Sequence, residues 1–84
     1  QLAEKGINEF PQASASMHEA LGHIYFDKND LKKSTENTLK MIEYGGDPYT
    51  AYATVIGRFQ EKGDDENAAR YYRAAIQKGI MAPQ

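Results

Sequence analysis

Helix-breaking residues recur along this chain at an interval of about 35 residues. The three prolines, Pro11, Pro48 and Pro83, lie 37 and 35 positions apart, and a glycine stands a few residues before each of them. Residues 4–7 (EKGI) are nearly repeated as residues 77–80 (QKGI), about two intervals later. Self-similarity at this period is typical of arrays of stacked helical repeats.

The middle of each interval carries a turn signal, Lys28-Asn29-Asp30 in the first and Lys62-Gly63-Asp64 in the second, 34 positions later. Between the turns, apolar residues follow the spacing of an amphipathic helix, and no segment alternates as a strand would. The stripes are Met17, Leu21, Ile24 and Tyr25; a weaker set of Leu31, Thr38, Leu39 and Ile42; Tyr52, Val55, Ile56 and Phe59; and Ala68, Tyr71, Tyr72, Ala75 and Ile76. The pattern predicts helices near 14–28, 30–44, 48–62 and 64–79.

The expected ends of these helices carry capping residues. Ser16 followed by Glu19 predicts a capping box. Asp47 before Pro48 predicts an N-cap with proline in the first turn, and Asp64 predicts another N-cap. The residues that suit the positive φ following a helix are Gly45, Gly63 and Gly79.

These signals predict an all-α chain, a fragment of an α-solenoid built from stacked antiparallel helical hairpins. One hairpin is expected over residues 11–47 and a second over 48–84, and residues 1–10 are expected to end a preceding repeat. Because about three repeats are usually needed for independent stability, we expect the isolated chain to be marginal or to self-associate.

Composition excludes several classes of function. The chain has no cysteine, which rules out disulfides, thiolate zinc sites and thiol nucleophiles. A net charge of −2 argues against a strongly cationic nucleic-acid binder, and we predict no DNA partner. No apolar run approaches the roughly 20 residues of a membrane span, so we predict no membrane contact. Phosphate-binding and nucleophile motifs are also missing from the sequence, so we predict neither an enzyme nor a cofactor.

A pair of histidines and a run of acidic residues resemble metal-binding motifs, but neither has the spacing that a metal site needs. His18 and His23 lie near a zinc-protease motif, but a spacing of five places them about 140° apart on a helix rather than on one face. Residues 64–66 are acidic, yet they lack the glycine and alternating ligands of a calcium loop. Negative charge at a helix start explains them better, and we predict no metal site.

The second interval carries a set of motifs in a particular order. It opens with residues 48–56 (PYTAYATVI), turns at 62–64, and closes with 78–80 (KGI) before Pro83. Its second helix has a small–aromatic–small stripe of Ala68, Tyr72 and Ala75. In this order and at this spacing, the chain resembles the pentatricopeptide repeat (PPR) family over nearly its whole length.

The first interval is similar but looser. Its matching residues are Leu21, Tyr25, Asn29, Asp30, Leu31, Met41, Gly45 and Pro48. Ser34 and Thr38 stand where the family usually has alanine and an aromatic residue. The related tetratricopeptide repeat (TPR) family would also suit two sets of residues, Leu21-Gly22 with Tyr25 and Gly63-Asp64 with Ala68 and Tyr72. The period and the Lys-Gly-Ile ending favour PPR.

The PPR resemblance implies a non-enzymatic repeat protein of mitochondria or, alternatively, chloroplasts. Most members of the family bind single-stranded RNA, reading an unstacked base with one residue of the first helix and one at the repeat end. The implied role is a scaffold or an RNA- or protein-binding module in organellar RNA metabolism, or in a ribonucleoprotein such as the mitochondrial ribosome, where ribosomal RNA is a possible partner. The alternative is a TPR-type protein–protein interaction module with no RNA role.

The family's reading positions fall here on Glu19 and Ala53 in the first helices, and on Tyr49 and Gln84 at the repeat ends. Ala53 has no hydrogen-bonding side chain, and the carboxylate of Glu19 only accepts and repels phosphate. We therefore expect scaffolding or protein contact from neighbouring repeats or subunits, with any RNA contact made to the sugar-phosphate backbone.

Overall fold

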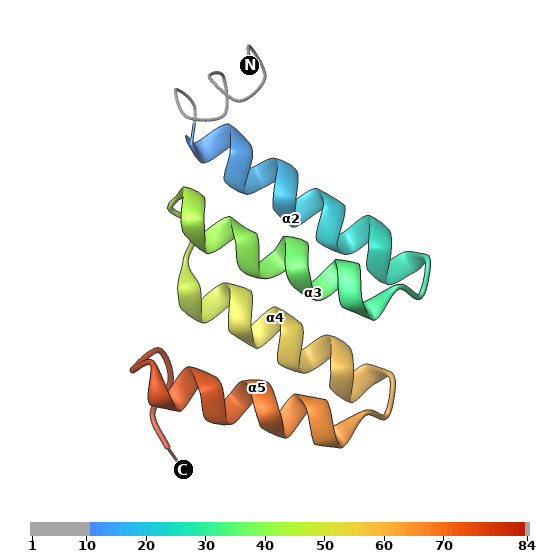
Figure 1. Ribbon diagram of the computed structural model, residues 1–84, viewed down its shortest axis with the longest axis vertical. Helices are drawn as coiled ribbons and strands as arrows, with labels where there is room; N and C mark the ends of the chain where they lie inside the picture. Colours follow the sequence, from blue (N-terminus) through green and yellow to red (C-terminus); the bar gives the residue numbers. More distant parts are fainter. Residues whose placement is uncertain (1–10, 84) are drawn as a thin grey trace.

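The computed structural model describes residues 11–83, which form an all-α arrangement with no strand in that range (Figure 1). In chain order the elements are α2 (Pro11–Asp27), α3 (Leu31–Lys40), a 3₁₀ helix η1 (Met41–Tyr44), α4 (Pro48–Glu61) and α5 (Asp65–Gln77). The prediction that residues 1–10 end a preceding repeat falls outside the described residues.

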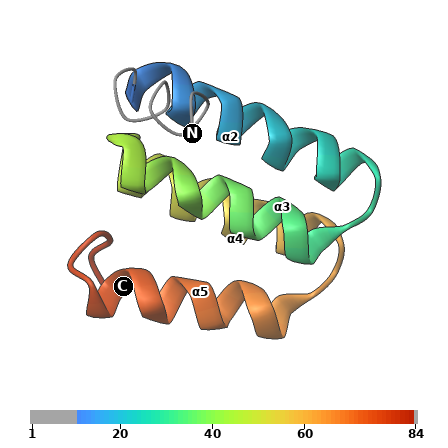
Figure 2. The ribbon, with the colours of Figure 1, turned by 45° about the horizontal axis from the view of Figure 1, so that its top comes forward.

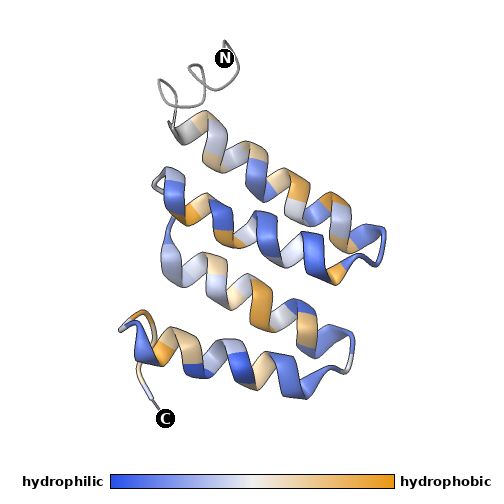
Figure 3. Ribbon diagram, in the orientation of Figure 1, coloured by the Kyte–Doolittle hydropathy of each residue, from blue (hydrophilic) through white to orange (hydrophobic). Residues whose placement is uncertain are grey.

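The helices pair into two antiparallel hairpins, α2 with α3 and α4 with α5, and the hairpins meet where α3 packs on α4. Figure 2 shows α3 in front of α4, so the helices do not lie in one flat row. Hydrophilic residues occupy both hairpin turns, near residues 29 and 63 (Figure 3). The prediction of packed helical hairpins is confirmed, and their continuation into a solenoid stays a prediction.

Most of the predicted helix ends are confirmed. The side chain of Asp47 accepts a hydrogen bond from the backbone N–H of Thr50 at 3.0 Å, and Asp64 caps α5 in the same way. The residues that follow the helices with positive φ are Gly45 (89°), Gly63 (76°) and Gly79 (73°). In the first hairpin turn the place of Gly63 is taken by Asn29 at φ 64°, a residue that tolerates this region.

The predicted capping box is wrong, because α2 begins at Pro11 and Ser16 lies inside the helix. Proline is favoured in the first turn, where its missing N–H costs nothing, and alanines at 13 and 15 propagate the helix. The second predicted helix is also shorter than expected. It ends at Lys40 and tightens into η1, where Gly46 N–H bonds the Met41 carbonyl at 2.9 Å.

The hydrophobic core lies at the contact between the two hairpins. Its buried members are Val55, Phe59 and Ala68, and partly buried Leu31, Leu39, Ile56 and Tyr71 pack against them. The rings of Phe59 and Tyr71 stack with centroids 5.6 Å apart. Burial of this apolar surface, drawn from α3, α4 and α5, holds one hairpin on the other.

Three predicted core residues lie elsewhere. Met17 and Ile24 on α2 are 43% and 46% exposed, and Tyr72 on α5 is only half-buried. Met17 and Ile24 lie on an exposed side of α2, and Tyr72 lines a groove between α4 and α5. A stripe at helical spacing predicts which residues share a face, but not which faces acquire a neighbour.

Candidate functional site

The predicted base-reading residues are exposed but offer little to a base. Glu19 lies on α2 and Ala53 on α4, both exposed, and Tyr49 is 57% exposed in the first turn of α4. Tyr49 and Ala53, four residues apart, lie on one face of α4. That face presents a phenol and a methyl group. Gln84 falls outside the described residues.

The most developed polar site is a junction where α2, α3 and α4 meet. Arg58 on α4 donates two hydrogen bonds from one guanidinium nitrogen, to Thr38 Oγ1 at 2.7 Å and to Ser34 Oγ at 3.1 Å. Ser34 Oγ in turn donates to the Gly22 carbonyl of α2 at 2.7 Å. One short chain of hydrogen bonds therefore connects three helices and both hairpins. We call Gly22, Ser34, Thr38 and Arg58 the polar junction.

The junction is buried on the α3 side. Ser34 and Thr38 are 1% and 2% exposed, so their hydroxyl groups have exchanged water for these partners. An unpaired buried hydroxyl costs about 1–3 kcal/mol. Arg58 is half-buried, and its removal from water lowers the pKa of the guanidinium, while Asp27 and Glu19 act in the opposite direction.

Close approach of the helices at the junction depends on a residue without a side chain. A Cβ atom placed on Gly22 would lie 2.3 Å from Thr38 Oγ1, 3.2 Å from a nitrogen of Arg58 and 3.2 Å from the Ser34 carbonyl. The first of these distances is shorter than any side chain tolerates. Gly22 thus allows α2 to approach α3 closely enough for the hydrogen bonds to form.

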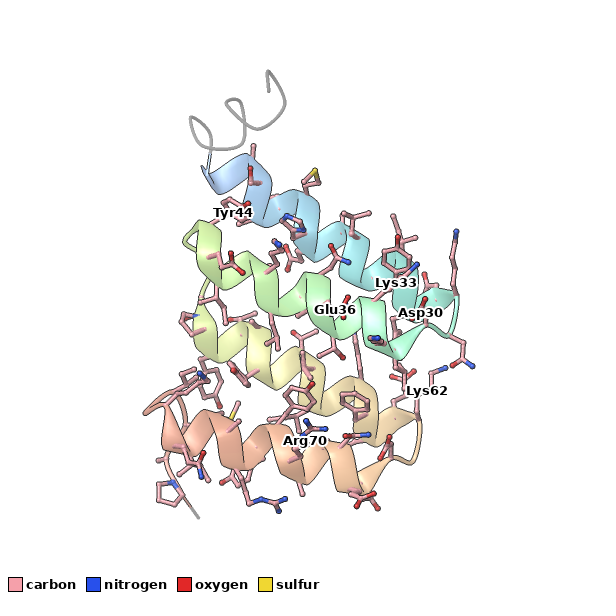
Figure 4. The ribbon with its side chains drawn as sticks, in the orientation of Figure 1. Asp30, Lys33, Glu36, Tyr44, Lys62 and Arg70 are labelled. Atoms are coloured by element: carbon pink, nitrogen blue, oxygen red, sulfur yellow. The ribbon has the colours of Figure 1, made fainter. Side chains whose placement is uncertain are left out.

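Aromatic and basic side chains surround the junction. The Phe26 ring on α2 has Arg58 at 5.4 Å and Lys62 at 4.9 Å from its centre, which are cation–π distances. Figure 4 shows Lys62 at the same end of the molecule as Asp30 and Lys33, beside the hairpin turns. Arg58 of α4 and Lys62, the residue that follows this helix, are therefore both engaged with the first hairpin.

The sequence analysis noted Ser34 and Thr38 as departures from the family pattern, placed Thr38 in a weak helical stripe, and did not single out Arg58. The signal available was a pair of hydroxyl residues, four apart, at positions of α3 expected to be buried. Such a pair needs a donor or an acceptor from a neighbouring helix. The donor could not be named in advance, because it lies 20 residues beyond Thr38.

An open groove of about 560 Å³ lies on the far side of the second hairpin. It runs between α4 and α5, and its lining includes Ala53, Ile56, Gly57, Ala68, Ala69 and Tyr72. Small side chains make up much of the floor. The Tyr72 hydroxyl donates a hydrogen bond to the Ala82 carbonyl at 3.2 Å, which holds the last residues beside the groove.

The residues that had suggested metal binding have other partners. The His18 ring stacks on Tyr44 with centroids 5.5 Å apart and hydrogen bonds to Asn37 Oδ1 at 3.0 Å. His23 lies 3.4 Å from the carboxylate of Asp27, one turn along α2. Among residues 11–83, no three histidines, cysteines or carboxylates come together as a set of metal ligands.

No helix within residues 11–83 combines the length and the apolar character required to cross a bilayer. Comparison of the chain with models of protein families, with curated proteins and with solved structures finds no match. The case for function therefore depends on the residues and their geometry.

Proposed function

We propose that this chain is a PPR-like helical repeat segment that acts as a non-enzymatic scaffold, holding a protein or RNA partner within an organellar ribonucleoprotein. The observation that carries the proposal is the polar junction. Hydrogen bonds from Arg58 to Ser34 and Thr38 fix one hairpin on the next, and a fixed arrangement of hairpins is what a scaffold requires. The mitochondrial location, with the chloroplast as the alternative, is proposed from the family resemblance alone.

Base reading by these hairpins is not part of the proposal. Discrimination between bases needs paired donors and acceptors worth roughly 1–3 kcal/mol. Ala53 supplies none, and the carboxylate of Glu19 can only accept hydrogen bonds. Arg58 and Lys62 contact Phe26 within the protein. Contact with an RNA, where it occurs, is therefore made to the sugar-phosphate backbone and follows its shape.

A second candidate is a TPR-type protein–protein interaction module with no RNA role. The observation that favours it is the close packing at Gly22, where a Cβ atom would collide with Thr38. The pair Leu21-Gly22 followed by Tyr25 is the part of this sequence that resembles TPR most. Under this candidate the partner is a protein segment, and RNA affinity is absent.

Binding to RNAs that differ at single positions, followed by fluorescence anisotropy, tests the proposal. We expect Ala53→Asn to change base preference by less than about 0.5 kcal/mol, because one amide cannot replace a two-residue reader. The matched control is Ala74→Asn, which places the same side chain on α5 outside the groove that contains Ala53. A shift of more than about tenfold, or roughly 1.4 kcal/mol, on changing Glu19, Tyr49, Ala53 or Gln84 would refute the proposal. No RNA binding by any form of the protein would favour the TPR candidate.

A further inference from the structure

Part of the open groove of the second hairpin corresponds to the surface of the first hairpin that α4 covers. The two hairpin turns, 28–30 and 62–64, fix a shift of 34 positions between the hairpins. This shift relates the groove residues Gln60, Ala68 and Tyr72 to Phe26, Ser34 and Thr38, each of which contacts Arg58. These groove residues therefore repeat a surface on which, in the first hairpin, α4 is docked.

The opposite end of the molecule presents the matching face. Ala13, Met17, Ala20 and Ile24 are all exposed and follow a spacing of four, three and four along α2, which places them on one side of the helix. The same shift relates Met17 to the fully buried Ala51 and Ile24 to Arg58. The outer stripe of α2 is thus the equivalent of the face with which α4 docks.

The residues of the two free faces differ from those of the inter-hairpin contact in a matched way. At the inter-hairpin contact, the cation of Arg58 meets the hydroxyl groups of Ser34 and Thr38. At the free faces, the equivalent of the cation is Ile24, and the equivalents of the hydroxyl residues are Ala68 and Tyr72. An aliphatic side chain would thus meet a methyl group and an aromatic ring, with no buried charge left unpaired.

Charge at the end of the groove also fits. The one carboxylate in the groove lining is Asp65, at the start of α5. On the first hairpin, Lys62 lies over Phe26, at the corresponding end. The residue 34 positions before Lys62 is Lys28, so the shift places its ammonium group over Gln60, at the same end of the groove as Asp65.

We propose that copies of this chain associate head to tail, with α2 of one copy lying in the groove between α4 and α5 of the next. The contact repeats the one that α4 makes with the first hairpin. Because the two faces differ, the contact is heterologous, and each added copy leaves one face of each kind free for a further copy. The inference depends on the internal repeat and not on RNA contact, so it can fail without affecting the proposed scaffold role.

Two variants that each disable one face provide the test. Ile24→Glu places a charge on the stripe of α2, and Ala69→Glu places one in the groove. Both side chains are exposed in the single chain, so folding is preserved. Gln77→Glu adds the same charge at an exposed position of α5 outside both faces and serves as the control. Sedimentation velocity over a concentration series measures the association, and circular dichroism verifies the helix content.

We expect the unmodified chain and Gln77→Glu to form species larger than dimers as concentration rises. Each face variant alone should associate at least about tenfold more weakly, because docking would bury an uncompensated charge. An equimolar mixture of the two face variants should form a dimer and stop there, since one intact stripe and one intact groove remain.

A chain that stays monomeric at every concentration would overturn the inference, and so would a mixture that forms no dimer. Self-association that neither variant weakens would also overturn it, because a different surface would then be responsible. If either variant loses helix content, Met17→Glu and Gly57→Glu disable the same two faces and are subject to the same criteria.

Discussion

Replacing Gly22 by alanine should destabilise this protein, although the same change stabilises most helices. Gly22 lies inside α2, where alanine is favoured over glycine by about 1 kcal/mol. The added Cβ would lie 2.3 Å from Thr38 Oγ1, and Thr38 is only 2% exposed. Relief requires either rotation of the Thr38 hydroxyl away from Arg58 or separation of α2 from α3.

The magnitude follows from these alternatives. Loss of a hydrogen bond to a charged group costs about 1.5–3 kcal/mol, and forcing extra volume into a packed site costs about 1–3 kcal/mol. After the gain in helix propensity of about 1 kcal/mol is subtracted from either cost, we expect Gly22→Ala to lower the free energy of unfolding by about 0.5–2 kcal/mol. Urea unfolding followed by far-UV circular dichroism measures this quantity.

Gly57→Ala provides a matched control within the same chain. Gly57 also lies inside a helix, α4, but nothing stands within 4 Å of a Cβ placed there. This change should raise the free energy of unfolding by up to about 1 kcal/mol. The two substitutions are chemically identical and are expected to have opposite signs. If Gly22→Ala stabilises the chain as much as Gly57→Ala does, the close approach at the junction is not present in solution.

Further substitutions test the remaining contacts. Arg58→Met keeps the aliphatic stem but removes both donors, and should cost about 1.5–3 kcal/mol in the same urea assay; unchanged stability would contradict the role of the junction. Phe59→Ala should cost about 3–5 kcal/mol because its ring is buried, and Tyr72→Ala clearly less because its ring is half-buried; equal losses would refute the placement of the core. Hydrogen bonds from the side chains of Thr50 and Asn67, and then from their backbone N–H groups, lower the pKa of Asp47 and Asp64. The stability these caps contribute is therefore complete above the ordinary carboxyl pKa of about 3.9 and is lost as pH falls through the lowered folded-state values. Asparagine at both positions keeps an acceptor but cannot titrate, so acid unfolding of that double variant should depend less on pH in this window.

Local signals predicted local structure well. Asp47 and Asp64 cap helices, and Gly63 and Gly79 take positive φ, because each of these roles depends on a few adjacent residues. The start of α2 was misplaced because Ser16 and Glu19 satisfy a capping pattern that Pro11 overrides.

The polar junction could not be predicted in the same way. Its bonds join residues 12, 20 and 24 positions apart, and only the packing of α4 on α3 determines that Arg58 faces Ser34 and Thr38. Similarly, the stripe on α2 was found, but the exposure of Met17 and Ile24 depends on which helix acquires a neighbour.

The polar junction also bears on how the molecule unfolds. In a linear array of repeats, stability is the sum of what each unit contributes and what each contact between neighbours contributes, and the second kind of term makes adjacent units unfold together. Arg58 belongs to the second hairpin, but all its hydrogen-bonding partners named here belong to the first. Unfolding of either hairpin therefore leaves polar groups of the other without their hydrogen-bonding partners. For this reason the two hairpins unfold in one cooperative step. In hydrogen exchange, amides in the middle of α3 and α4 should share one opening free energy, while the end of α5, outside the junction, exchanges through smaller openings.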